Sequence, residues 1–223
     1  MSSVVSLTIQ KMKNYRAQTL EEEKINVLTH GLGIVFTLIA IPFLIKQALH
    51  YGANYGVWTV CIFGGGMLAT YLSSTIYHTV QQPKKKNILH ICDHICIFLL
   101  IGGTYTPIIF RYIPFNEAVF FMATMWSIIV LGIVFKLFFT GKLEWLSISL
   151  YVFLGWMLVF VAKPISKTMS FEVFTWILYG SFAYMIGIIF YKWRSRKYTH
   201  AVWHCLTLLG TMAHFVAVYK SFG

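Results

Sequence analysis

The sequence predicts an all-α membrane protein that folds as a seven-transmembrane helix bundle. Of its 223 residues, 58% are hydrophobic and only 11% are charged, and the mean hydropathy is +0.70. A soluble domain usually carries about 25% charged residues. Seven apolar stretches are each long enough to cross a bilayer, which requires about 20 residues. These stretches cover residues 28–49, 57–79, 88–110, 117–139, 145–164, 172–192 and 200–219.

The segment that precedes the first span is polar. It predicts an extramembrane arm over residues 1–26, followed by a single membrane domain over residues 27–223. The arm lacks the apolar core and cleavage site of a signal peptide, so we expect no cleaved leader. Leu7, Ile9 and Met12 belong to a weak amphipathic pattern, which is compatible with a short helix on the membrane surface.

Basic residues gather on one side of the predicted bundle. The arm and the second, fourth and sixth loops carry thirteen of the 18 Lys and Arg residues. Loops rich in Lys and Arg remain in the cytoplasm, so we expect a cytoplasmic N-terminus and a C-terminus outside, in a multi-pass protein of the cell membrane. This topology accounts for the net charge of +11, and we therefore expect no nucleic-acid partner.

Small residues are frequent inside the spans. The glycines at positions 64–66 in the second span and 102–103 in the third permit close helix approach or a cavity, and we expect close packing. The four cysteines also fall in apolar stretches, and we expect them to be small buried side chains rather than metal ligands.

Ionisable side chains inside the spans indicate function, because lipid offers them no hydrogen-bond partner. His200 and His204 open the seventh span, where a spacing of four puts them on one helix face, about 6 Å apart along the axis. His78 closes the second span, and Asp93, the single Asp of the chain, lies in the third. The expected topology places all four groups at one depth near the cytoplasmic face.

Three imidazoles and one open position are typical of a catalytic zinc ion. We therefore predict Zn2+ bound by His78, His200 and His204, with water as the fourth ligand. Zinc lowers the pKa of its bound water towards ~7. Asp93 is then the catalytic candidate that hydrogen-bonds to this water or takes its proton.

Ser74 is the second catalytic candidate. It lies one turn before His78 on the same helix face. Its hydroxyl could orient a ligand or bind substrate. The alternative is a hydrogen bond to the backbone of its own helix, and the spacing does not decide between the two roles.

A second histidine pair, His90 and His94, has the same spacing and flanks Asp93. Around a helix, His94 points about 100° and His90 about 60° to the same side of Asp93, so the pair and Asp93 cannot all face one ion squarely. A site built from His90, His94 and His78 nevertheless stays open from spacing alone. His214 lies about 15 Å deeper than His204, so we expect it to hydrogen-bond across helices instead.

Three ordered motifs resemble those of the progestin and adipoQ receptor family, whose bacterial branch is called hemolysin III. The first is EKINVLTH, from Glu23 to His30. The second runs from Ser74 through His78 to the block DHICIFLLIGGTYTP, which begins at Asp93. The third is HAVWHCLTLLGTMAHF. The resemblance extends over residues 21–219.

The resemblance implies a seven-helix bundle with a cytoplasmic N-terminus and a zinc ion near the inner face. The zinc ligands of the family correspond, through the shared motifs, to His78, His200 and His204. A water bridges the ion to Asp93, and Ser74 lies beside them. This implication decides against the site that would use the second histidine pair.

The roles of the other motif residues follow less directly. Glu23, Asn26 and His30 start the first span, where they could brace the site or bind a polar head group, or simply form a capping and packing cluster. The sequence also departs from the adiponectin receptors of this family. Their large cytoplasmic domain and long extracellular tail are missing, and His94 stands where they have Tyr. We therefore do not expect a hormone receptor.

The adiponectin receptors are linked to ceramidase activity. The leading hypothesis is thus a zinc-dependent hydrolase that acts on a membrane lipid, a ceramide-like amide or an ester, from the cytoplasmic leaflet. One alternative is a sensor or regulator of membrane composition with a structural zinc. Another is a cytolysin, as the name of the bacterial branch suggests. A membrane lipid is the expected partner, and a homo-oligomer is compatible with the sequence.

Overall fold

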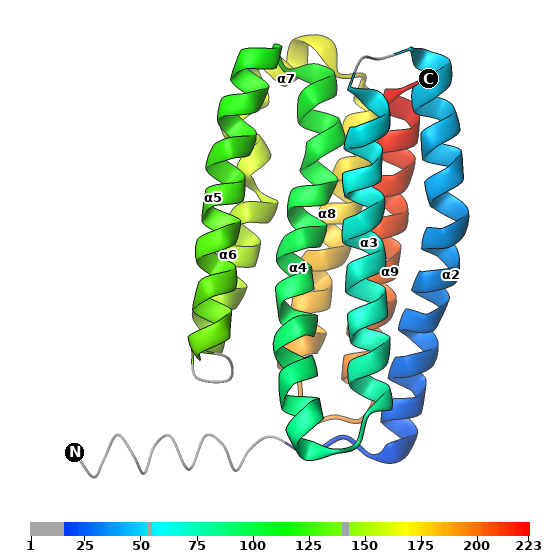
Figure 1. The fold of residues 1–223 in the computed structure, drawn as a ribbon, viewed down its shortest axis with the longest axis vertical. Coiled ribbons are helices and arrows are strands. Elements are labelled where there is room, and N and C mark those ends of the chain that lie inside the picture. Colours follow the sequence, from blue (N-terminus) through cyan, green and yellow to red (C-terminus); the bar gives the residue numbers. More distant parts are fainter. Residues whose placement is uncertain (1–15, 53–54, 140–142) are drawn as a thin grey trace, which may run out of the picture.

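A computed structural model describes residues 16–52, 55–139 and 143–223. Within these ranges the chain forms a helical bundle with 7 helices long and apolar enough to cross a membrane (Figure 1). The predicted fold class is therefore confirmed. The amphipathic pattern that includes Leu7 and Ile9 lies outside the described residues. The side of the membrane on which the N-terminus lies stays a prediction.

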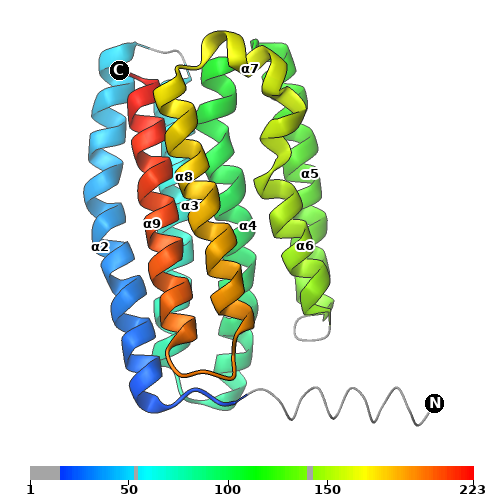
Figure 2. The same cartoon turned by 180° about the vertical axis from the view of Figure 1, so that it is seen from behind.

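Successive helices run up and down the bundle. They are α2 (Leu20–Tyr51), α3 (Gly56–Thr79), α4 (Pro83–Tyr112), α5 (Phe115–Phe139), α6 (Glu144–Gly155), the 3-10 helix η1 (Met157–Val161), α7 (Ala162–Thr168), α8 (Phe171–Lys192) and α9 (Thr199–Ser221). Helix α3 packs on α2 and α4, α8 packs on α9, and α9 also contacts α2. The α5–α6 pair joins the bundle mainly through α4 (Figures 1 and 2). We call the end at which α2 begins, the lower end in both views, the N-terminal end.

Helix α2 begins at Leu20, inside the segment that the sequence assigns to the arm. Its first turn is stabilised by a capping box. Thr19 Oγ1 accepts the Glu22 N–H at 3.3 Å, and the Glu22 carboxylate accepts the Thr19 N–H at 2.9 Å. An N-cap of this kind contributes about 1 kcal/mol. The helix therefore starts before the apolar span and places Glu23 and Asn26 inside the bundle.

Glycines allow α3 and α4 to lie close together, as predicted. A Cβ atom on Gly66 would lie 2.7 Å from the carbonyl oxygen of Leu99, and one on Gly103 would lie 3.0 Å from that of Ile62. Real Cβ atoms do not approach a backbone so closely without displacing it, so larger side chains would push the two helices apart.

The cysteine prediction was wrong for most positions. Cys61, Cys92 and Cys205 are exposed on the helix surfaces and Cys96 is half-buried, and all four are free thiols. An apolar stretch in a membrane bundle has a lipid-facing side as well as an inner side. Hydropathy alone therefore does not tell which side chains are buried.

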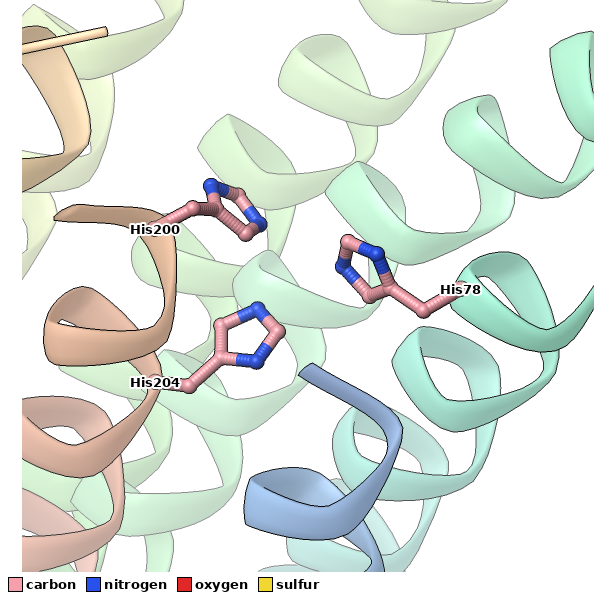
Figure 3. A group of neighbouring side chains, drawn as sticks. All are labelled: His78, His200 and His204. Atoms are coloured by element: carbon pink, nitrogen blue, oxygen red, sulfur yellow. The ribbon is translucent and has the colours of Figure 1, made fainter. Parts of the chain in front are cut away.

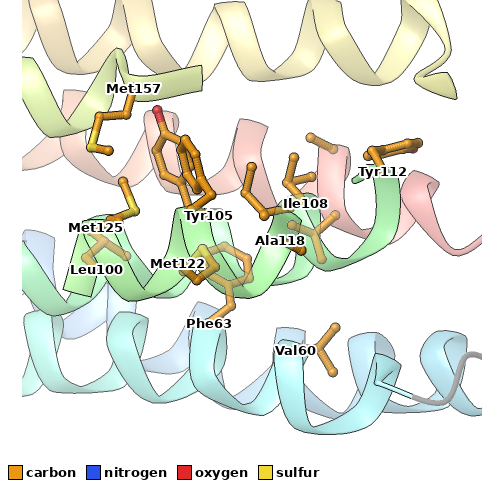
Figure 4. Close-up of a cluster of buried hydrophobic side chains, with 14 of the residues drawn as sticks. Val60, Phe63, Leu100, Tyr105, Ile108, Tyr112, Ala118, Met122, Met125 and Met157 are labelled. Carbon is orange, nitrogen blue, oxygen red and sulfur yellow. The ribbon is translucent and has the colours of Figure 1, made fainter. Parts of the chain in front are cut away.

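The apolar core includes residues from most of the described helices, from α2 and α9 across to α5, and Figure 4 shows its part between α3, α4, α5 and η1. Val60 and Phe63 of α3 are at most 1% exposed, and Met122 and Met125 of α5 at most 5%. This packed half supports α4, which also carries Asp93 towards the N-terminal end.

The fifth span, predicted as one stretch over residues 145–164, is interrupted. Helix α6 ends at Gly155 and η1 follows. Tyr105 of α4 enters the break: its hydroxyl donates to the Gly155 carbonyl at 2.8 Å and accepts the Leu158 N–H at 3.0 Å. Pro164 of α7 has no N–H and its ring would clash with the Phe160 carbonyl, so η1 and α7 cannot join as one regular α-helix either. The tyrosine replaces hydrogen bonds that the break removes.

Candidate metal centre

Three histidines from two helices meet at the N-terminal end of the bundle. His78 lies in the last turn of α3, and His200 and His204 lie in the first two turns of α9. One nitrogen from each ring lies within 4.8 Å of the other two, and the rings face a common space (Figure 3). Among the described residues, this is the one group of three or more His, Cys, Asp or Glu side chains that could hold a metal ion.

Unpaired nitrogens show that this space fits a cation. His78 and His204 are each 1% exposed, and Nε2 of His78 and Nε2 of His200 are buried without a hydrogen-bond partner. A buried polar atom left without a partner costs about 1–3 kcal/mol. A divalent ion that prefers imidazole nitrogen, such as Zn2+, would accept these lone pairs and remove that cost.

Glu23 of α2 orients His78. Its Oε2 atom lies 2.6 Å from Nδ1 of His78, and its Oε1 atom accepts the Lys86 ammonium at 2.7 Å. An ionised carboxylate only accepts hydrogen bonds, so Nδ1 of His78 carries the proton and donates it. The lone pair is therefore on Nε2, the atom without a partner. A carboxylate behind a ligand histidine is the arrangement that usually fixes such ligands in metal sites.

Thr29 of α2 orients His204 in the same way. Its hydroxyl donates to the Asn26 carbonyl at 2.9 Å and lies 3.1 Å from Nδ1 of His204. A hydroxyl has a single hydrogen, which is already used, so Nδ1 of His204 must donate to the Thr29 oxygen. The lone pair of His204 is then on Nε2.

Glu22 holds the start of α9, where His200 lies. Its carboxylate accepts the Tyr198 N–H at 2.9 Å and the Arg16 guanidinium. Tyr198 has a φ of 64°, a left-handed conformation that is uncommon for a bulky residue. The contact with Glu22 therefore stabilises the sharp turn from which α9 and His200 start.

His30 packs flat against a ligand histidine. Its ring stacks on His204 with centroids 3.6 Å apart and planes 18° apart, and Tyr71 meets it edge-on at 5.2 Å. His30 is 3% exposed, and neither of its ring nitrogens has a hydrogen-bond partner. It lies outside the group of three and limits how the ring of His204 can turn.

Asp93 and Ser74 lie beside the three histidines. Asp93 of α4 lines a polar cavity of about 170 Å³ together with His200. Ser74 is 1% exposed, lies one turn before His78 on α3, and has a buried hydroxyl without a hydrogen-bond partner. Asp93 is not a member of the histidine group.

The second histidine pair does not join this group. The rings of His90 and His94 are 4.4 Å apart, but Nδ1 of His94 lies 2.9 Å from the Lys136 ammonium. A lysine at this distance occupies the position that a metal ion would need. His214 donates from Nε2 to the Ile177 carbonyl at 3.2 Å, which confirms the expected bond across helices.

Two apolar cavities follow the polar cavity along the bundle. It shares four wall residues with an apolar cavity of about 120 Å³ between α4, α6, α8 and α9: His94, Ile97, Tyr191 and Trp203. That cavity in turn adjoins one of about 440 Å³ nearer the C-terminal end, with which it shares Thr104, Tyr105, Trp156 and His214. The break after α6 borders both apolar cavities.

Two contacts of the site were not predicted in detail. The sequence singled out Glu23 without deciding its role, and it did not single out Thr29. Glu23, Asn26, Thr29 and His30 follow a spacing of three or four, which places them on one face of α2. That spacing, together with a carboxylate in a membrane-spanning helix, is the signal that could have indicated contacts of Glu23 and Thr29 with the histidines.

The chain is similar in sequence to several known proteins. A family model described as Haemolysin-III related matches residues 18–215, which include every residue of the centre. The Hemolysin-3 homolog of Bacillus subtilis (strain 168) is 38% identical over 200 residues, which cover 90% of this chain and 94% of the relative. Hemolysin-3 of Bacillus cereus is 32% identical over 201 residues, covering 90% and 92%. The human Monocyte to macrophage differentiation factor is 23% identical over 231 residues, covering 95% and 92%.

Proposed function

The chain is a multi-pass membrane protein of the haemolysin III family, and we propose that it is a zinc-dependent hydrolase of a membrane lipid. The observation that carries the proposal is the convergence of three histidines, two of them with buried and unpaired Nε2 atoms, beside a carboxylate and a series of adjoining cavities. The bond to be cleaved is a ceramide-like amide or an ester.

The donor set supports zinc as the ion. His78, His200 and His204 supply three neutral nitrogens, and the neighbouring polar cavity leaves room for a water and for the reacting carbonyl. Bound there, zinc would supply a Lewis acid and a water that is acidic enough to attack near neutral pH. Glu23 and Thr29 keep two of the ligand rings in the binding tautomer.

Asp93 is the proton carrier in this proposal. It takes one proton from the attacking water as the water oxygen bonds to the carbonyl carbon. It then delivers that proton to the leaving nitrogen or oxygen as the C–N or C–O bond breaks. Ser74, buried next to Asp93, orients its carboxylate or binds the substrate carbonyl.

The apolar cavities support a lipid as the substrate. The apolar cavities begin at the wall of the polar cavity and extend along α4, α6, α8 and α9 towards the C-terminal end. An alkyl chain in this space places its polar end near Asp93 and His200. The expected orientation puts that end in the cytoplasmic leaflet.

The test is hydrolysis by the purified protein. Wild-type protein loaded with zinc should release fatty acid from a ceramide or an ester lipid, and a chelator should abolish the release. His78→Ala and Asp93→Asn should lower the rate at least about a hundredfold, the usual contribution of general acid–base groups. His50→Ala removes an exposed histidine at the other end of α2 and should keep full activity. Hydrolysis that is unchanged after zinc removal would contradict the proposal.

Cell lysis is a second candidate, because the relative from Bacillus cereus is named Hemolysin-3. The matched pair of variants separates the two functions. If lysis results from membrane perturbation, His78→Ala should lyse red cells as well as His50→Ala does. If lysis follows from lipid hydrolysis, His78→Ala should lose both activities together.

A further inference from the structure

A buried cation lies in the wall of the apolar cavity, outside the metal centre. Lys136, in the last turn of α5, is 2% exposed. Its Nζ atom lies 2.9 Å from Nδ1 of His94 and 5.9 Å from the centre of the Tyr151 ring. Burying an ionisable side chain in a membrane-spanning helix is costly, and such residues usually serve a function.

The contact with Lys136 determines which nitrogen of His94 carries hydrogen. An ammonium group only donates, so Nδ1 of His94 accepts and Nε2 bears the N–H. The backbone of His94 is held as well, because its carbonyl accepts the Tyr151 hydroxyl at 2.9 Å. His94 lines both the polar and the apolar cavity, and Lys136 lines the apolar one. The pair thus brings N–H donors to the boundary between the two cavities.

The apolar cavity also contains one acidic side chain, Glu144. Glu144 accepts the Tyr191 hydroxyl at 2.6 Å and forms an ion pair with Arg194. Over the polar and the smaller apolar cavity together, four basic side chains face three acidic ones. The basic residues are Lys136, Arg194, Arg196 and Arg16, and the acidic residues are Glu144, Asp93 and Glu22. The lining therefore carries one excess positive charge, which favours an anionic ligand.

We propose that Lys136 and His94 bind the anionic group, a phosphate or a carboxylate, of an amphiphilic ligand whose alkyl chain occupies the apolar cavity. Charge-assisted hydrogen bonds from an ammonium to such a group are about twice as strong as neutral ones. The inference deepens the proposed function and rests on it for the lipid nature of the ligand. It assigns this place to the anionic end of the lipid, either the head group of the substrate or the carboxylate of the released fatty acid.

The test compares ligands of one chain length. The full chain, in nanodiscs of neutral lipid and stripped of metal by a chelator, is titrated calorimetrically with dodecyl phosphate, dodecanoic acid and dodecanol. Removing the metal prevents an anion from binding the ion itself, and none of the three compounds can be hydrolysed. The result is therefore independent of whether the protein is a hydrolase.

We expect an anionic ligand to bind at least about tenfold more tightly than dodecanol, equal to about 1.4 kcal/mol. Tighter binding of the phosphate points to a substrate headgroup, and tighter binding of the carboxylate points to a released fatty acid. Both outcomes support the site. Equal affinity of wild-type protein for the charged and uncharged ligands overturns it, and this comparison needs no variant that might misfold.

Substitutions of Lys136 test whether this side chain causes the preference for the anionic ligand. Lys136→Met keeps the length of the side chain and should reduce the preference to less than about twofold while leaving dodecanol binding unchanged, whereas Lys136→Arg should keep most of it. Lys46→Met, which removes an exposed lysine of α2, is the matched control and should bind like the wild type. A preference that survives in Lys136→Met contradicts the assignment.

Discussion

The carboxylate of Glu23 lies 2.6 Å from Nδ1 of His78. This contact joins the first turns of α2 to the last turn of α3, and Lys86 at the start of α4 bonds to the same carboxylate at 2.7 Å. One acidic side chain thus connects three helices behind the metal centre. It also sets the tautomer in which His78 can bind an ion.

Glu23→Gln should weaken zinc binding. The amide keeps the shape of the side chain but loses the charge that favours the Nδ1 proton of His78, and changes of this kind typically reduce metal affinity about 10- to 100-fold. The measurement is a zinc titration against a competing chelator. Glu21→Gln is the matched control, because Glu21 is exposed in the same turn. Equal losses in both variants would refute a specific role of Glu23.

Thr29→Val should also lower zinc affinity, because the valine cannot accept the Nδ1 hydrogen of His204. The buried N–H would then lack a partner, which costs about 1–3 kcal/mol. Thr29→Ser keeps the hydroxyl and should restore most of the affinity. The same chelator competition measures both variants. If the serine variant is as weak as the valine variant, the hydrogen bond is not the cause.

The stack of His30 on His204 predicts different results for two substitutions. His30→Phe keeps a flat ring and should retain zinc affinity, whereas His30→Ala should reduce it because the ring of His204 gains freedom to turn. Cobalt substituted for zinc gives a visible absorption spectrum that reports ligand geometry. We expect this spectrum to change in the alanine variant and to stay close to wild type in the phenylalanine variant. The reverse order would contradict the stacking role.

Hydropathy predicts the spans, and residue spacing places His78, His200, His204 and Asp93 at one depth. Hydropathy and spacing can be read from the sequence because each depends only on residues that are near one another in the chain. They do not reveal that Glu23 reaches His78, since that contact joins side chains on different helices. The same limit explains the fifth span. Residues 145–164 are apolar throughout, and the break there depends on a tyrosine from α4.

Tyr105→Phe tests the account of that break. The variant removes the hydroxyl that bonds to the Gly155 carbonyl and the Leu158 N–H, so two partly buried backbone groups lose their partner. We expect a loss of about 1–3 kcal/mol per unsatisfied group, measured as a lower midpoint of thermal unfolding in detergent. Tyr179→Phe changes an exposed tyrosine of α8 and serves as the control. Equal midpoints for the two variants would contradict the bridging role.

The most direct test of the central claim is anomalous diffraction at the zinc absorption edge, from crystals of the zinc-loaded protein. We predict one zinc ion per chain, with Nε2 of His78, His200 and His204 at about 2.0–2.1 Å. The fourth position should hold a water that bridges to Asp93. Absence of zinc from the histidine group would contradict the metal centre. An Asp93 oxygen bonded directly to zinc would instead close the site, which would favour a structural ion in a membrane sensor over a hydrolase.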